Sequence, residues 1–292
     1  MIDVEKIYHN NLLWNSPINF EGVFLYPVTV SQINLFKQCS AVLQIDPLEL
    51  PDIKFQAMSR LRFILETFRM LEEEDTPPAY QAIPQLFVML IRMVLGDEQE
   101  ISLQHPTDRR LDGKILHITR RPSQTDQGVS LVLTPKLFDD FRRVVLIQNG
   151  IDISEEEVDP VMRRVYNEDM VRLQRAGQTQ SGITEEDRLD LMSLHNRCLR
   201  SELGEMPLRE YILKTDRLLT KEIYQAQLNG QMTGFVKFKK EPRHWLIRQT
   251  NKEKILSHFR TEDDVKGLLN EKSSSLASSN FIRRENNAKY KC

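Results

Sequence analysis

Apolar side chains recur at steps of three and four through most of the chain, and this period most constrains its fold. After Pro51 they occupy one helical face, at Ile53, Ala57, Met58, Leu61, Ile64, Leu65, Phe68 and Leu71. The same period covers residues 82–95 and resumes over 134–150. Because an α-helix has 3.6 residues per turn, such side chains line one of its sides. The chain is therefore predicted to have a mainly α-helical, bundle-like body.

Residues with capping preferences mark where the later helices begin. Thr134 is placed as an N-cap, and Thr184 with Asp187 resembles a capping box, with Asp where Glu or Gln is usual. Pro207 and Thr220 are predicted to open the last two helices. A further helix, opened at Asp159-Pro160, carries an apolar stripe that we expect to be buried, namely Met162, Val165, Tyr166, Met170 and Leu173.

Two regions alternate instead and predict a small antiparallel β component. Residues 18–30 are rich in β-branched and aromatic side chains around Glu21-Gly22, which predicts a hairpin near the N-terminus. Pro27 has no N–H to donate, so the second strand is expected at an edge or broken there. Residues 98–133 hold three alternating runs separated by turn residues, which predicts a short β insert. The predicted fold class is α+β, mainly α.

Four regions follow from this pattern. Residues 1–97 hold the hairpin and the first helices, 98–133 the β insert, 134–248 a C-terminal helical region, and 249–292 a polar tail. The tail has nine Lys/Arg against six Asp/Glu, a surplus of +3 that leaves the body at −5. We expect this tail to be flexible apart from a short helix near 262–270, dispensable for folding and involved in association.

The cysteines and the apolar runs indicate the compartment. Cys39, Cys198 and Cys292 are odd in number and form no CxxC, which predicts free thiols in a reducing environment. The most apolar run, 83–95, is interrupted by Arg92 and is shorter than the ~20 residues of a membrane span. The first residues lack the basic start of a secretory signal. A cytoplasmic protein without a membrane partner is predicted.

No motif for catalysis or cofactor binding stands out. The 11 glycines form neither GxGxxG nor a P-loop, and there is no GxSxG. His195 and Cys198 have the spacing of half a metal site, but no second His or Cys pair accompanies them, so helix packing is the preferred interpretation. Paired carboxylates lie mostly at predicted helix N-termini, where they suit the helix dipole. We expect a protein without enzymatic activity, cofactor or metal.

Basic residues raise the alternative of nucleic-acid binding. Arg120-Arg121 lie in the loops of the β insert, and Lys237 to His244 are interleaved with aromatic side chains, an arrangement that can line a nucleic-acid strand. The acidic body opposes this alternative. A solvated loop or a protein-binding patch is the favoured interpretation.

Several segments in order carry a resemblance to known proteins. GVFLYPVTV runs into SQINLFKQCSAVLQID, followed by DIKFQAMSRLRFILE, FDDFRRVVLIQNG and MPLREYILKTDRLLTKEIYQAQLNG with GFVKFKKEPRHWLI. This order, over residues 18–248, resembles tail-assembly-type proteins of phages and prophages of Gram-positive bacteria. It is similar to tail assembly chaperones, which hold the tape-measure protein soluble while the tail tube grows around it.

The resemblance implies a non-enzymatic protein of the host cytoplasm that binds tape-measure or tube proteins during virion morphogenesis, with self-association left open. A structural virion subunit, such as a baseplate or connector component, is the first alternative, and a nucleic-acid-binding accessory protein the second. From the residues themselves, the candidate partner-binding side chains are aromatic anchors, namely Phe24, Tyr26, Phe235, Phe238 and Trp245. For Trp245 the competing interpretation is closure of the core of the last helices.

Overall fold

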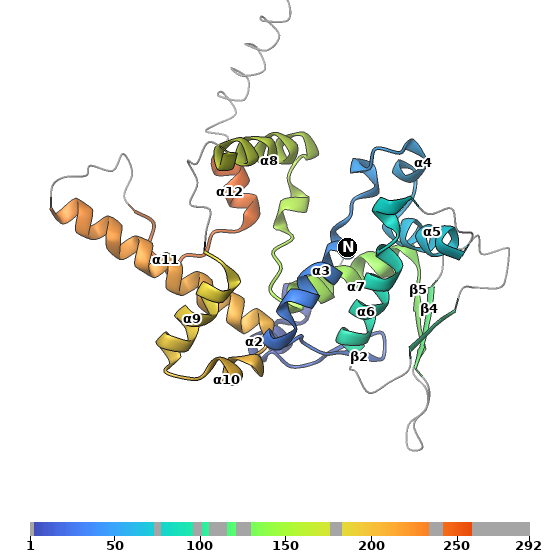
Figure 1. Cartoon of the computed structure of the whole chain (residues 1–292), viewed down its shortest axis with the longest axis horizontal. Helices are drawn as coiled ribbons and strands as arrows, with labels where there is room; N and C mark the ends of the chain where they lie inside the picture. Colours follow the sequence, from blue (N-terminus) through green and yellow to red (C-terminus); the bar gives the residue numbers. More distant parts are fainter. Residues whose placement is uncertain are drawn as a thin grey trace, which may run out of the picture. The chain divides into compact units, whose positions relative to one another are not determined.

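The computed structural model describes residues 3–72, 77–95, 101–104, 116–120, 130–175, 183–233 and 242–258. The chain divides into two compact units (Figure 1). Unit 1 comprises Met1–Ile151 with Ile183–Leu246, and unit 2 comprises Asp152–Gly182 with Ile247–Cys292. The fold is mainly α with a small antiparallel β component, as predicted. The unit boundaries differ from the predicted regions, because residues 152–182 leave the helical region 134–248 and join the chain after 246.

The predicted hairpin is present near the N-terminus of unit 1. Its strands pair with Ile18 opposite Leu25 and Phe20 opposite Val23. The turn residues Glu21 and Gly22 have φ of 49° and 82°, the left-handed conformation that matches the twist of a two-residue hairpin. The side chains of the four paired residues named above are buried. The elements of this region are α1 (Val4–Ile7), α2 (His9–Trp14), β1 (Ile18–Phe20) and β2 (Val23–Leu25).

Four helices build the core of unit 1: α3 (Ile33–Gln44), α5 (Arg60–Glu72), α6 (Ile83–Leu95) and α7 (Pro135–Gln148). A chain of aromatic rings connects the hairpin to them. Phe20 meets Phe141 at 5.8 Å between ring centroids, Phe141 meets Phe138 at 6.3 Å, and Phe138 meets Phe87 at 6.1 Å. Phe20 comes from β1, the next two from α7 and the last from α6, so the rings join three elements distant in sequence.

The helix predicted from Pro51 is interrupted in the structure. Asp46 and Asp52 each accept a backbone N–H two residues further on, and each therefore starts a short element of its own. These elements are η2 (Pro47–Glu49) and α4 (Ile53–Gln56), and they precede α5. Ser31, just before α3, likewise lies inside a short element of its own, the 3₁₀ turn η1 (Val30–Gln32). Further short 3₁₀ turns are η3 (Pro78–Tyr80) in unit 1 and η5 (Ser154–Glu157) in unit 2.

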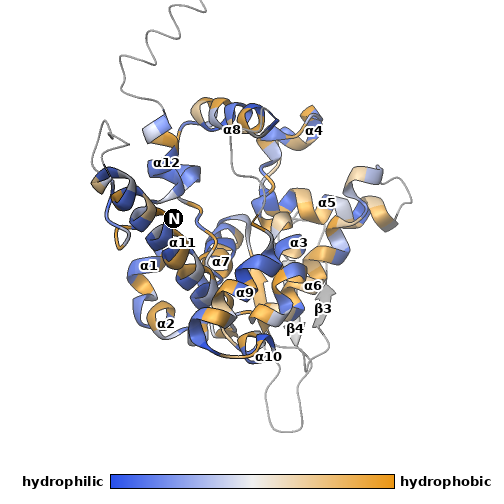
Figure 2. Cartoon of the chain, turned by 60° about the vertical axis from the view of Figure 1, so that its left-hand side comes forward, coloured by the Kyte–Doolittle hydropathy of each residue, from blue (hydrophilic) through white to orange (hydrophobic). Residues whose placement is uncertain are grey.

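By length and composition, Pro78–Leu95 is one candidate membrane span among the described residues. Most of it is α6, which packs against α3, α5 and β2 inside unit 1. Phe87, Leu90, Ile91 and Val94 of this helix are fully buried. Figure 2 shows α6 as strongly apolar, as expected of a core helix, and core helices pass the same length and composition test.

The predicted β insert forms a three-stranded antiparallel sheet in the order β3-β4-β5. The strands are β3 (Ile101–Gln104), β4 (Leu116–Arg120) and β5 (Ser130–Leu133). Leu131 and Leu133 of β5 are buried, and Thr134 then caps α7 by accepting the N–H of Leu137 at 3.3 Å. The predicted cap at Thr134 is confirmed.

The end of unit 1 holds α9 (Glu185–Asn196), α10 (Arg200–Gly204) and α11 (Leu208–Met232). The two last helices predicted from sequence are one continuous helix, α11. Thr220, expected to be a cap, lies within it and donates its hydroxyl to the carbonyl of Asp216 at 2.7 Å. A Thr that bonds to the preceding turn does not end a helix, and no Gly or Pro interrupts the chain at this point.

Unit 2 is built from η5, α8 (Pro160–Arg175) and α12 (Asn251–His258). The Asp152 carboxylate accepts the N–H of Asn251 at 2.7 Å, and the Asn251 side chain donates to the Asp152 carbonyl at 3.1 Å. Ile255 is buried. The tail predicted to be flexible from residue 249 therefore begins with an ordered helix. The helix expected near 262–270 and the remaining tail lie outside the described residues.

Candidate functional site

Two of the predicted partner-binding residues lie on the hairpin. The Phe24 side chain is 53% exposed, on the face of β2 opposite to buried Val23 and Leu25. Tyr26, also exposed, follows directly and is held through its backbone, because its N–H donates to the carbonyl of Val94 at 2.7 Å. The hairpin thus presents two aromatic side chains from a backbone that the core fixes in place.

Trp245 is connected to helix α11 through the ring of His244. Its ring stacks on His244 at 5.7 Å, and the His244 ring is 5.3 Å from that of Tyr224 on α11. Trp245 is half-buried, which does not fit the competing interpretation of a core-closing side chain. Phe235 and Phe238, the other two predicted anchors, lie outside the described residues.

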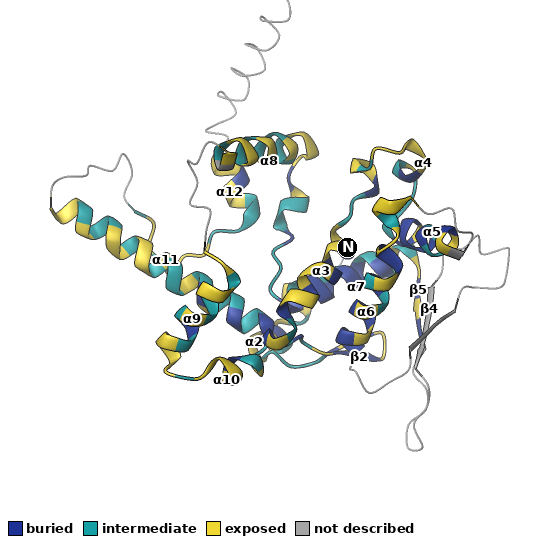
Figure 3. Ribbon diagram, in the orientation of Figure 1, coloured by how far each residue is buried: buried dark blue, intermediate teal, exposed yellow. Residues whose placement is uncertain are grey.

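The second half of α11 is a surface that the sequence prediction missed. Beyond Thr215 none of the described side chains of this helix is fully buried, and Figure 3 shows that half in the colours of intermediate and full exposure. Ile223 is 56% exposed and Met232 is 85% exposed. We call Ile223, Tyr224 and Met232 of α11, together with His244 and Trp245, the distal α11 surface.

A signal for this surface exists in the sequence. The buried side chains of α11 are Leu208, Tyr211 and Thr215, at steps of three and four. The same steps continue through the half-buried Leu218 to Glu222 and Gln225, which are polar and exposed. The fully buried stripe therefore ends after about two turns. Ile223, Tyr224 and Met232 lie off this stripe and are exposed or half-buried.

A polar joint fixes the base of α11 to the rest of unit 1. The buried Tyr211 hydroxyl donates to Glu185 Oε1 at 2.7 Å, and Lys37 forms an ion pair with the same carboxylate. Lys37 comes from α3, Glu185 from the first turn of α9 and Tyr211 from α11. One carboxylate therefore connects three helices and sets the direction in which α11 leaves the core.

The joint favours the ionised carboxylate and the neutral phenol. Burial raises the pKa of Glu185, but the hydrogen bonds from Lys37 and Tyr211 outweigh it, so the pKa is lowered overall. Burial and the neighbouring Glu185 carboxylate raise the pKa of Tyr211 above its ordinary value. Glu185 is thus charged and Tyr211 uncharged at neutral pH, which are the protonation states the hydrogen bond requires.

The depressed pKa of Glu185 predicts an acid-sensitive contribution to stability. Because the folded-state pKa is lowered, this contribution is present above about pH 4.3, the ordinary value for glutamate, and is lost as pH falls through the folded-state pKa. Glu185→Gln should lower the free energy of unfolding by about 1.5–3 kcal/mol at pH 7 and by less at pH 3. Urea denaturation at both pH values measures this, with the exposed Glu222→Gln as control. An effect independent of pH would contradict the assignment.

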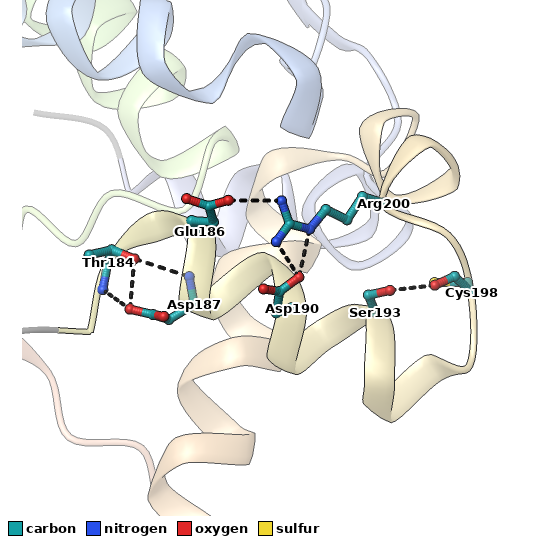
Figure 4. Close-up of polar contacts among 7 residues, drawn as sticks. All are labelled: Thr184, Glu186, Asp187, Asp190, Ser193, Cys198 and Arg200. Carbon is teal, nitrogen blue, oxygen red and sulfur yellow. Dashed lines mark hydrogen bonds and ion pairs between the residues drawn. The ribbon is translucent and has the colours of Figure 1, made fainter.

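The polar groups of α9 and α10 hold the two helices together (Figure 4). Thr184 and Asp187 form the predicted capping box, with the Asp187 N–H donating to the Thr184 hydroxyl at 3.1 Å and the Thr184 N–H donating to the Asp187 carboxylate at 2.7 Å. Arg200 donates to Asp190 at 2.6 Å and to Glu186 at 3.2 Å. The capping box thus fixes the start of α9, and Arg200 connects α10 to α9 at the protein surface.

His195 and Cys198, whose spacing raised the alternative of a metal site, have no further metal ligands grouped with them among the described residues. His195 is exposed on α9 and Cys198 is half-buried after it, and no group of three or more His, Cys, Asp or Glu that could hold a metal occurs in the described part of the chain. The Ser193 hydroxyl donates to the carbonyl of Cys198, so it serves the turn between the helices. Cys39 is a buried thiol whose pKa burial raises, and Cys292 lies outside the described residues.

Comparison with known proteins gives no relative for this chain. No family model matches it, and neither a curated protein nor a solved structure shows significant similarity.

Proposed function

We propose that the chain is a non-enzymatic protein of phage tail assembly that binds the tape-measure protein, in the manner of a chaperone, during virion morphogenesis. The observation that carries the proposal is the distal α11 surface, where apolar and aromatic side chains extend beyond the core of unit 1. The resemblance of the sequence segments over 18–248 to tail assembly chaperones is what suggests the tape-measure protein as the partner. The host cytoplasm is the proposed location.

The chemistry of the distal α11 surface suits protein binding. Ile223 and Met232 offer apolar area, and the Trp245 and Tyr224 rings, with His244 between them, offer flat faces. Aromatic side chains and Met are enriched in interfaces, and a few buried anchors carry most of the binding energy. Ile223 and Met232 are nine residues apart and therefore lie on opposite sides of α11, so a partner has to contact more than one side of the helix to remove both from water.

The hairpin offers a second, smaller contact of the same kind. Phe24 and Tyr26 lie next to each other along a short two-stranded sheet, and their backbone is fixed by the core. Exposed aromatic groups on a fixed backbone lose little conformational freedom on binding, which lowers the cost of association. We propose that this edge adds to the affinity supplied by the distal α11 surface.

The proposal is tested by expressing the chain together with the tape-measure protein of the same phage. Ile223→Asp and Trp245→Ala are each expected to weaken capture of that protein at least about tenfold and to reduce its soluble fraction. Gln225→Asp introduces the same charge on an exposed polar position of α11 and is expected to leave capture unchanged. Equal capture by all variants would exclude this surface as the binding site.

Mass spectrometry of purified particles separates the proposal from its first alternative. A chaperone acts before the tail is complete and is expected to be absent from finished particles. A baseplate or connector subunit would be present in a fixed copy number, and that result would replace the chaperone proposal with the structural one. Salt-dependent retention on DNA would instead favour the nucleic-acid-binding alternative.

A further inference from the structure

Two helices carry apolar stripes that are only partly removed from solvent. The stripe of α8 is predicted to be buried from the sequence, but in the structure its members are only half-buried: Met162, Val165, Tyr166, Met170 and Leu173. The other stripe lies on the distal half of α11 and is more exposed. The spacing of this second stripe specifies what would cover it.

The stripe on α11 consists of two large apolar residues followed by two small ones. They are separated by four, three and four positions and therefore share one side of the helix, and we call them the α11 stripe: Leu219, Ile223, Ala226 and Gly230. Leu219 is half-buried, Ile223 is 56% exposed and Ala226 is exposed. This side of α11 thus offers an apolar face to another helix.

The spacing of the α11 stripe is the same when it is read in either direction. A second copy of α11 laid antiparallel against the first therefore meets it position for position, about a two-fold axis that passes between Ile223 and Ala226. Ile223 then faces Ala226 of the second copy, and Leu219 faces Gly230 of the second copy. Each large side chain meets a small residue, so the two helices can pack closely without leaving voids.

A parallel pair of α11 helices would match less well in size and in charge. Every residue of the stripe would face its own counterpart, so Gly230 would face Gly230 and leave a gap. Asp216, three positions before the stripe, would face the same carboxylate of the second copy, and like charges repel. In the antiparallel pair Asp216 faces the uncharged Thr233, and Glu222, beside the stripe, comes near the uncharged Asn229. Both criteria therefore select the antiparallel arrangement.

The antiparallel pair also gives Gly230 a role. Glycine inside a helix lowers the stability of that helix, yet α11 continues past this residue to Met232. A larger side chain at position 230 would occupy the space into which Leu219 of the second copy packs. The missing side chain is therefore useful in the pair, whereas it weakens an isolated helix.

We propose that α11 pairs with α11 of a second copy of this chain, antiparallel and through the α11 stripe. The pairing goes beyond the proposed function and does not depend on it. Within the distal α11 surface only Ile223 belongs to the α11 stripe, and Met232 lies on the opposite side of the helix. The second copy therefore leaves the side of Tyr224 and Met232 to another protein. Because the stripe is short, a dissociation constant on the order of 10 µM is expected.

Sedimentation equilibrium of the full chain, without any other protein, tests the pairing. The chain is expected to form a dimer that dissociates on dilution. Gly230→Leu should weaken this dimer at least about tenfold, although leucine favours the helix and adds apolar area. Gln231→Leu adds the same side chain off the stripe and should not weaken the dimer. A monomer at every concentration, or a dimer that Gly230→Leu leaves intact or strengthens, would overturn the proposal.

Cysteine cross-linking tests the antiparallel register. Asp216→Cys and Thr233→Cys are each placed in a full chain that carries Cys198→Ser and Cys292→Ser, so that only the buried Cys39 remains besides the new thiol. Positions 216 and 233 are about 25 Å apart along one helix. Mild oxidation should therefore cross-link a mixture of the two variants but neither variant alone. A parallel pair would cross-link each variant with itself, and that result, or no cross-link in the mixture, would overturn the register.

Two further variants separate the pairing from binding of the tape-measure protein. Ala226→Glu places a charge next to the two-fold axis and should dissociate the dimer, whereas Gln225→Glu adds the same charge off the stripe and should not. Trp245→Ala should leave the dimer unchanged while it weakens capture of the tape-measure protein. A dimer that survives Ala226→Glu would overturn the pairing, and unchanged capture by Trp245→Ala would count only against the proposed function.

Discussion

Replacing Ile255 by alanine is expected to detach α12 from unit 2, whereas the same change at the adjacent Leu256 should have little effect. Ile255 is 2% exposed and Leu256 is 46% exposed, so only the first leaves a cavity. Truncating a buried Ile to Ala costs about 2–5 kcal/mol. Because the described part of unit 2 has few buried apolar side chains, this loss is comparable to the stability that a unit of this size can have.

Hydrogen exchange measures the detachment, since α12 and α8 amides should lose protection in Ile255→Ala while those of α7 keep it. Leu256→Ala removes the same kind of side chain from a half-solvated position and serves as the control. Cutting the chain after Arg248 should have the same consequence for α8, because it removes α12 altogether. Retained protection of α8 in both altered proteins would mean that unit 2 does not need α12.

The position of α12 shows where sequence reasoning reaches its limit. The segment after residue 249 is polar and charged, and apart from a short helix near 262–270 its local composition predicts no ordered structure. Its order comes from a partner about a hundred residues earlier, because Asp152 accepts the N–H of Asn251. Burial raises the pKa of Asp152, but hydrogen bonds from Ser154 and Asn251 outweigh it and the pKa is lowered, so the acceptor stays charged.

Local signals predicted local structure well. The hairpin turn at Glu21-Gly22 and the cap at Thr134 depend on residues within a few positions of each other, and both are present. The extent of burial could not be derived in the same way. The stripe of α8 looks like that of a core helix, but whether it is covered depends on which other segments pack against it. The period of apolar residues shows which face of a helix is apolar, but it does not show which other segment packs against that face.

The candidate site was predicted in part for the same reason. Phe24, Tyr26 and Trp245 were predicted as aromatic interface anchors, and the structure leaves them exposed or half-buried. The distal half of α11 was missed because the sequence predicted a separate helix from Thr220 onward. The polar residues Glu222 and Gln225, where the buried stripe of α11 would continue, were the available signal. A helix can be assigned to a core only as far as the residues on its buried face remain apolar.

Replacing Asn149 by alanine is expected to destabilise unit 1 by about 2–4 kcal/mol. The Asn149 side chain is buried at the end of α7, where its Oδ1 accepts the N–H of Val28 at 2.7 Å and its Nδ2 donates to the carbonyl of Val145 at 2.8 Å. Alanine removes both bonds. The N–H of Val28 then has neither its partner nor water, and an unsatisfied buried donor costs more than the bond itself contributed.

Urea denaturation followed by circular dichroism measures the change, with Asn34→Ala as the control. Asn34 is exposed on α3, so its replacement should alter the free energy of unfolding by no more than about 0.5 kcal/mol. Asn149→Asp keeps the acceptor for Val28 but loses the donor to Val145, and its cost should fall as pH is lowered and the carboxyl is protonated. If Asn149→Ala is as mild as the control, the segment that follows the hairpin must be held by its other contacts. The bond from the N–H of Leu208 to the carbonyl of Val28, at 2.8 Å, is one of these.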